Sequence, residues 1–161
     1  MKKLTKKEIP NELTNQLEFS EILSENLSNY KGEFSEVLNF APKIYELLCK
    51  LLESPNISRK DRGAITSAIA YFILPRDIYP EEVFGVKGYI DDVYLCLHIL
   101  KHIERVYEFE EILDQWSGSS KELKKLLDKD YSELDKKFNH RLKDMLDYVG
   151  LKLVFGQWFR M

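Results

Sequence analysis

Three aspartates, Asp77, Asp91 and Asp92, stand close together in the sequence, and Glu81 lies between the first and the second. Carboxylate oxygens are the ligands that Mg²⁺ and Mn²⁺ prefer, and a bound divalent ion can support hydrolysis or phosphoryl transfer. The same segment contains no nucleophile, phosphate-binding loop or positioned base. A site for Mg²⁺ or Mn²⁺ at these four residues therefore stays an alternative, and no cofactor is expected.

The same acidic residues also have a structural interpretation, which we favour. Pro75 and Pro80 fix the backbone φ angle and end a helix, so the chain must turn there. Asp77 lies between them and can accept hydrogen bonds from loop amides. Asp91 and Asp92 fall in the first turn of the next predicted helix, where unpaired N–H groups favour carboxylates.

Two histidines, His98 and His102, are one helical turn apart, which is the spacing at which two imidazoles can share a zinc ion. Ile99 occupies the position where the His-Glu-x-x-His motif needs its general base, so that motif is absent. Lys101 and Arg105 share this polar side of the helix. We therefore predict solvated or boundary histidines, with a metal site as the alternative.

Other catalytic arrangements have no local support. Cys49 and Cys96 lie in apolar helical segments and are predicted to be reduced, buried thiols. The chain contains no Gly-x-Ser-x-Gly, Walker-type or Cys-x-x-Cys motif. The sequence thus favours a protein that is not an enzyme.

Helical periodicity dominates the whole chain and predicts an all-α, single-domain bundle of about six to seven helices over residues 1–161. Pro42 predicts either a kink or the restart of a helix with proline in its first turn. The segment from Ser58 to Leu74 has many small residues, and we expect it at the centre of the bundle. The predicted helices cover residues 11–30, 33–53, 58–74, 89–107, 108–116 and 120–129, and a last one begins near 132.

Local signals mark where two of these helices begin. Ser58 precedes Asp61 at the spacing of an N-terminal cap. Ser119 and Glu122 have the spacing of a capping box. Gly150 interrupts the last helix.

The segment from Ala68 to Leu97 reads AIAYFILPRDIYPEEVFGVKGYIDDVYLCL and resembles the YkvA-like family of small domains of unknown function. The resemblance covers about residues 62–100, and it implies a helix, a Pro/Asp loop and a second helix at the core of the fold. Glu81 replaces a second Asp of the family pattern, Phe84 stands near a missing proline, and the loop is one residue longer. The family implies no reaction and no catalytic residues, although some members carry membrane segments. The matching positions are Pro75, Asp77, Ile78, Pro80, Gly88, Tyr89, Asp91 and Asp92.

The composition limits the expected partners. A net charge of −3, with both signs mixed along the chain, disfavours nucleic acid as a partner. The longest apolar run, Ala68 to Leu74, is far shorter than the ~20 residues that cross a bilayer, so no transmembrane segment is expected. We expect a cytoplasmic protein.

The C-terminal segment, residues 151–161, is rich in apolar and aromatic residues, including Phe155, Trp158 and Phe159. Such a segment either folds back on the bundle or contacts another protein, because chain ends are otherwise polar and loose. We predict a non-enzymatic interaction or regulatory module that binds another protein or itself. Its contact surface would be this segment or the loop with Pro75, Pro80 and Phe84, and peripheral membrane attachment is a further alternative.

Overall fold

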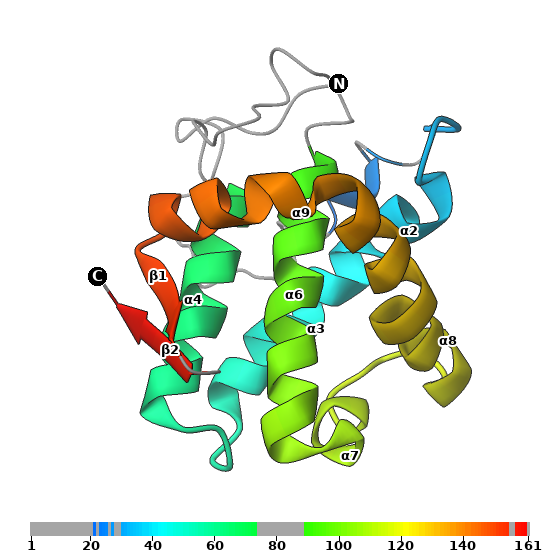
Figure 1. Cartoon of the computed structure of the whole chain (residues 1–161). Helices are drawn as coiled ribbons and strands as arrows, with labels where there is room; N and C mark the ends of the chain where they lie inside the picture. Colours follow the sequence, from blue (N-terminus) through cyan, green and yellow to red (C-terminus); the bar gives the residue numbers. More distant parts are fainter. Residues whose placement is uncertain are drawn as a thin grey trace.

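The computed structural model describes residues 21–73, apart from residues 22, 26, 28 and 29, and also residues 89–154 and 157–160. For Ile73 and for strand residues 152–154 and 157–160, only the backbone is described. The description contains seven α-helices, one π-helical segment and one short hairpin. The all-α prediction is confirmed for the body of the molecule, and the hairpin is an addition that the sequence analysis did not predict (Figure 1).

The described residues between 21 and 27 are helical, and two closely spaced helices follow them. One residue, Phe40, separates helix α2 (Ser35–Asn39) from helix α3 (Ala41–Glu53). Pro42 lies in the first turn of α3, where its missing N–H costs no helical hydrogen bond. Of the two alternatives for Pro42, the restart of a helix is therefore the one that the structure shows.

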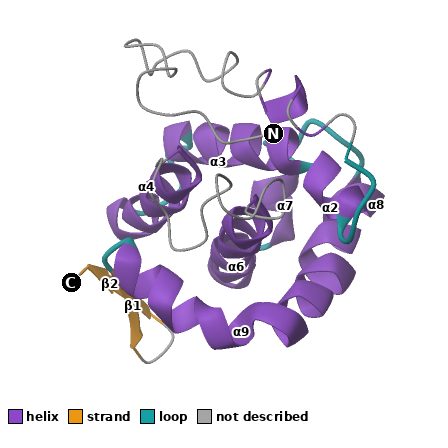
Figure 2. Cartoon of the chain, turned by 90° about the horizontal axis from the view of Figure 1, so that it is seen from above, coloured by secondary structure: helices purple, strands orange, loops and turns teal. Residues whose placement is uncertain are grey.

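Helix α6 (Tyr89–Tyr107) lies at the centre of the molecule, and α3, α4 and α9 surround it (Figure 2). Its bounds are those that the apolar pattern predicted. It buries side chains around most of its circumference, including Val93, Cys96, Leu97, Leu100 and Ile103. A helix that is apolar on most sides must be covered on most sides, which accounts for its central place.

Helix α4 (Arg59–Ile73) packs beside α6 and is not the central helix, so the predicted central position of residues 58–74 is wrong (Figure 2). Its small residues Ala64, Ser67 and Ala68 are buried, and they let α6 approach closely. Thr66 and Ala70 lie on its exposed side. Small side chains thus predicted close packing correctly, but they did not predict burial on all sides.

Helices α7 (Phe109–Leu113) and α8 (Ser120–Lys125) follow. The capping box at Ser119 and Glu122 is confirmed in both directions. Segment η2 (Leu126–Asp130) is π-helical and joins α8 directly to α9 (Tyr131–Tyr148). The two separate helices predicted from this region therefore form one continuous helical run, which curves around α6 (Figure 2).

The last described element is an antiparallel hairpin of β1 (Leu151–Val154) and β2 (Gln157–Arg160). Gly150 has φ +74°, a backbone conformation that glycine adopts without strain, and it turns the chain from α9 into β1. Strand β1 lies against α9, and β2 lies against α4 (Figure 1). Lys152 pairs with Phe159, and Leu153 pairs with Trp158.

The buried apolar side chains of these elements form one continuous core, to which α3, α4 and α6 contribute most of the residues. Cys49 and Cys96 are free and buried, as predicted. None of the helices that the structure describes has the length and apolar character needed to span a bilayer.

Candidate functional site

The polar side chains of α6 contact α4 on one side and α9 on the other. At the start of α4, the carboxylate of Asp61 is buried and accepts hydrogen bonds from two hydroxyls. The Tyr107 hydroxyl donates to Asp61 Oδ2 at 2.5 Å, and the Ser58 hydroxyl donates to the same oxygen at 3.1 Å. The Nε2 atom of His102 lies 3.0 Å from Asp61 Oδ1. One carboxylate therefore holds the end of α6 against the start of α4.

Ser58 and Tyr107 also contact each other, which closes this cluster. The Ser58 hydroxyl accepts the backbone N–H of Asp61 at 3.2 Å, so the predicted N-terminal cap is confirmed. The backbone N–H of Ser58 donates to the Tyr107 hydroxyl at 2.9 Å. Burial lowers the pKa of the His102 imidazole, and the Asp61 carboxylate opposes this shift. At neutral pH, His102 is therefore a neutral hydrogen-bonding group.

At the opposite end of α6, Asp91 makes a second contact with α4. The hydroxyl of Tyr71 donates to Asp91 Oδ2 at 2.7 Å, and both side chains are buried. Asp92, the next residue, is fully buried as well. Both aspartates lie in the first turn of α6, as predicted, where the helix N-terminus favours negative charge.

Replacing Tyr71 by phenylalanine is expected to lower the free energy of unfolding by about 2 kcal/mol, because a hydrogen bond to a buried carboxylate is lost. Urea denaturation at neutral pH measures the change. Tyr30→Phe is the matched control, because the Tyr30 hydroxyl donates to the Glu33 carbonyl at an exposed position. Equal and small losses in both variants would contradict a structural role for the Tyr71–Asp91 pair.

Helix α6 contacts α9 through two further polar pairs. The Tyr94 hydroxyl donates to Asp135 Oδ1 at 2.6 Å, and His98 Nδ1 shares a hydrogen bond of 2.8 Å with the Tyr131 hydroxyl. The rings of Tyr94 and Tyr131 stack with centroids 6.1 Å apart. Burial raises the pKa of Tyr131 to about 12 and lowers the pKa of His98 to about 4. Both groups are therefore uncharged at neutral pH.

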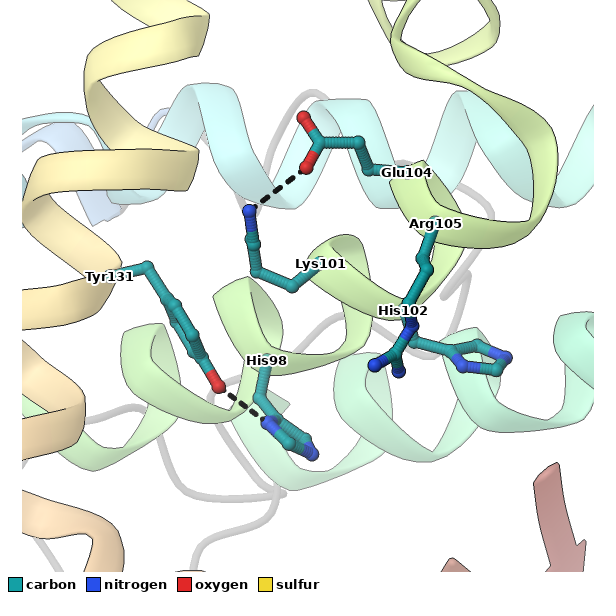
Figure 3. Close-up of a pocket in the computed structure, with 6 residues that line it drawn as sticks. All are labelled: His98, Lys101, His102, Glu104, Arg105 and Tyr131. Carbon is teal, nitrogen blue, oxygen red and sulfur yellow. Dashed lines mark hydrogen bonds and ion pairs between the residues drawn. The ribbon is translucent and has the colours of Figure 1, made fainter. Parts of the chain in front are cut away.

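A cavity of about 490 Å³ lies over the C-terminal half of α6, beside the start of α9 (Figure 3). Its volume is within the range of pockets that hold small organic molecules. Five of its lining residues belong to α6, and one belongs to α9. They are His98, Lys101, His102, Glu104, Arg105 and Tyr131.

The structure gives the two histidines partners on different helices. His98 contacts Tyr131 of α9, whereas His102 contacts Asp61 of α4, so each ring has a partner on a different helix. His102 is only 4% exposed, so the prediction of a solvated or boundary side chain is wrong for this residue. Within the described residues, no group of three or more His, Cys, Asp or Glu side chains is placed to hold a metal ion.

Several residues singled out in the sequence fall outside the described residues. They are Pro75, Asp77, Pro80, Glu81, Phe84 and Phe155. Trp158 and Phe159 lie in β2, opposite Leu153 and Lys152. Asp91 and Asp92 are thus the members of the predicted acidic site that the structure places, and both are buried in the first turn of α6.

Sequence reasoning missed four residues that contribute to the polar contacts of α6: Tyr71, Tyr107, Tyr131 and Asp135. Each contacts a partner between 20 and 46 positions away, so no short motif contains both members of a pair. The cap at Ser58 was the one local signal near this network. This cap signal indicated Asp61, but it did not indicate that Tyr107 and His102 hydrogen-bond to the Asp61 carboxylate.

Taken with the fold, these contacts define a small helical domain whose polar side chains join a central helix to its neighbours. Residues 61–97 match the model of a protein family described as "Protein of unknown function (DUF1232)". This match confirms the resemblance to the YkvA-like family over the helix–loop–helix, and it begins at Asp61.

The chain is also similar to "Uncharacterized protein ORF9" of Methanothermobacter thermautotrophicus. The two are 29% identical over 133 residues, which cover 83% of this chain and 90% of the relative. No solved structure matches the chain. The likeness to this relative thus extends well beyond residues 61–97.

Proposed function

We propose that this chain is a non-enzymatic interaction module whose helical body supports a contact surface at the C-terminal hairpin. The observation that carries the proposal is the hairpin itself. It is a two-stranded sheet, so each strand has one edge without a partner strand among the described residues. Open strand edges are a common route by which proteins add a strand from a partner.

The position of the hairpin supports the same function. Strand β1 lies against α9 and β2 lies against α4, so both strands rest on the helical body (Figure 1). Leu151, the first residue of β1, is buried in the core. A segment held in this way loses less conformational entropy on binding than a free tail would, which favours recognition.

The polar groups of α6 support a binding function over catalysis. Asp61, Asp91 and Asp135 each accept a hydrogen bond from a tyrosine, and in each pair the tyrosine belongs to another segment. Carboxylates used in this way hold helices in place. They give the module a rigid body on which a contact surface can be presented.

The experiment is a pull-down from source cells with the full-length chain, a chain that ends at Gly150, and a Trp158→Ala, Phe159→Ala double variant. We expect one stoichiometric partner that the full-length chain captures and that both variants lose. Val106→Ala is the matched control, because Val106 is 53% exposed and belongs to α6 and not to the hairpin, so this variant should retain the partner.

Circular dichroism and thermal melting must first show that the variants are folded, since the truncation removes the buried Leu151. The double variant keeps Leu151 and therefore serves where the truncation fails to fold. Capture of the same proteins by all four chains, or by none, would contradict the proposal.

A further inference from the structure

Two cationic side chains, Lys101 and Arg105, line the cavity over α6, and only one of them has an acidic partner among the described residues. Lys101 is paired, because its Nζ lies 2.9 Å from a Glu104 oxygen and 3.4 Å from an Asp128 oxygen. Arg105 is exposed and makes no hydrogen bond or ion pair with any residue that the structure describes. Figure 3 shows its guanidinium group directed toward the space between the two histidine rings.

The groups that face Arg105 are uncharged at neutral pH. Burial lowers the pKa of His98 and of His102, and the nearby positive charge of Arg105 shifts both in the same direction. Burial also keeps the Tyr131 hydroxyl protonated, since its pKa is raised to about 12. The side of the cavity near Arg105 therefore combines one uncompensated cation with neutral hydrogen-bonding groups.

The acidic groups near the cavity have other partners. Asp61 contacts His102 and accepts hydrogen bonds from Ser58 and Tyr107. Asp135 accepts from Tyr94, and Glu104 pairs with Lys101. None of them pairs with the guanidinium of Arg105.

We propose that this cavity binds a small oxyanion, a carboxylate or phosphate group, through the guanidinium of Arg105. A guanidinium presents two parallel N–H donors that match both oxyanions, and this geometry is more specific than that of a lysine. The cavity volume leaves room for an organic group attached to the anion. This site goes beyond the proposed interaction function and does not depend on the hairpin.

The proposal is tested by NMR titration of the full-length chain with inorganic phosphate and, separately, with benzoate, at constant ionic strength set with sodium chloride. We expect saturable amide shifts at residues 98–105 and 131, with a Kd in the millimolar range or tighter for at least one probe. The ratio of the two Kd values tells whether phosphate or a carboxylate on an apolar body is the better ligand.

Arg105→Gln should weaken binding at least about tenfold, and Arg105→Lys should fall between this variant and the wild type because it keeps the charge without the second parallel donor. Lys143→Gln is the matched control, since it removes one charge from an exposed position of α9 outside the cavity. Arg105 is exposed, so its variants are expected to fold, and the rest of the amide spectrum checks this.

Two results would overturn the proposal. The first is the absence of saturable shifts with both probes. The second is binding that Arg105→Gln leaves unchanged or that Lys143→Gln weakens to the same extent. Either result would leave the interaction function at the hairpin untouched, because residues 151–160 take no part in this test.

Discussion

Replacing Asp61 by alanine is expected to lower the free energy of unfolding by about 3–5 kcal/mol. The Asp61 carboxylate is buried and receives the hydroxyls of Tyr107 and Ser58 on one oxygen and His102 Nε2 on the other. Its removal leaves the buried His102 and the half-buried Tyr107 without this acceptor, and the loss of a partner from a buried polar pair is among the largest losses that single substitutions cause. The variant also opens a contact between the start of α4 and the end of α6.

Urea denaturation of the wild type and the variant at neutral pH measures this loss. Asp128→Ala is the matched control, because Asp128 is 68% exposed and its ion pair with Lys101 is long, at 3.4 Å. Exposed ion pairs of this kind contribute about 0–1 kcal/mol. If Asp61→Ala costs no more than this control, the Asp61 cluster does not hold α4 to α6.

The second large effect concerns pH and His98. Burial lowers the pKa of folded His98 to about 4, whereas an unfolded histidine titrates near 6.5. Between these two values the unfolded chain binds the extra proton, so acidification favours unfolding. His98 therefore contributes stability that is present above pH 6.5 and is lost as the pH falls toward 4. The expected loss is about 2–3 kcal/mol over that range.

The measurement is the free energy of unfolding from urea denaturation at several pH values between 7 and 4. His98→Gln keeps a polar side chain that can reach Tyr131 and removes the titrating group, so its dependence on pH should be shallower than that of the wild type. His140→Gln removes a histidine from an exposed position and is the comparison variant. The same slope in both variants would contradict the account of His98.

Local signals in the sequence predicted much of the fold. The bounds of α6, the cap at Ser58 and the capping box at Ser119 depend on residues within a few positions of one another, and all are confirmed. Pro42 allowed two outcomes, and the structure shows the restart of a helix. These features follow from local backbone chemistry, which a sequence displays directly.

Other parts of the fold depend on contacts between distant segments. Whether residues 126–130 end a helix or continue it as a π-helix is decided by packing, because η2 lies against α6. Residues 151–154 and 157–160 pair as a hairpin that rests on α4 and α9, and these short strands have no strong local signal. The central position of α6 likewise follows from which helices surround it.

In the candidate site, too, local spacing could be predicted from the sequence, whereas contacts between distant residues could not. The spacing of His98 and His102 predicted one polar side of a helix, and both rings do line one cavity. Their partners could not be predicted, because Asp61 precedes His102 by 41 positions and Tyr131 follows His98 by 33. A buried carboxylate beside His102 makes burial of that histidine possible, and this contact arises only in the folded chain.

The most direct test of the interaction function is site-specific photo-crosslinking in source cells, with a photoreactive phenylalanine analogue placed at position 158 in β2. The control places the same analogue at position 106, which is exposed on α6. The account predicts a cross-link to one defined partner, or to a second copy of this chain, from position 158 and none to that partner from position 106. The absence of a specific cross-link at 158, or equal cross-linking from both positions, would contradict it.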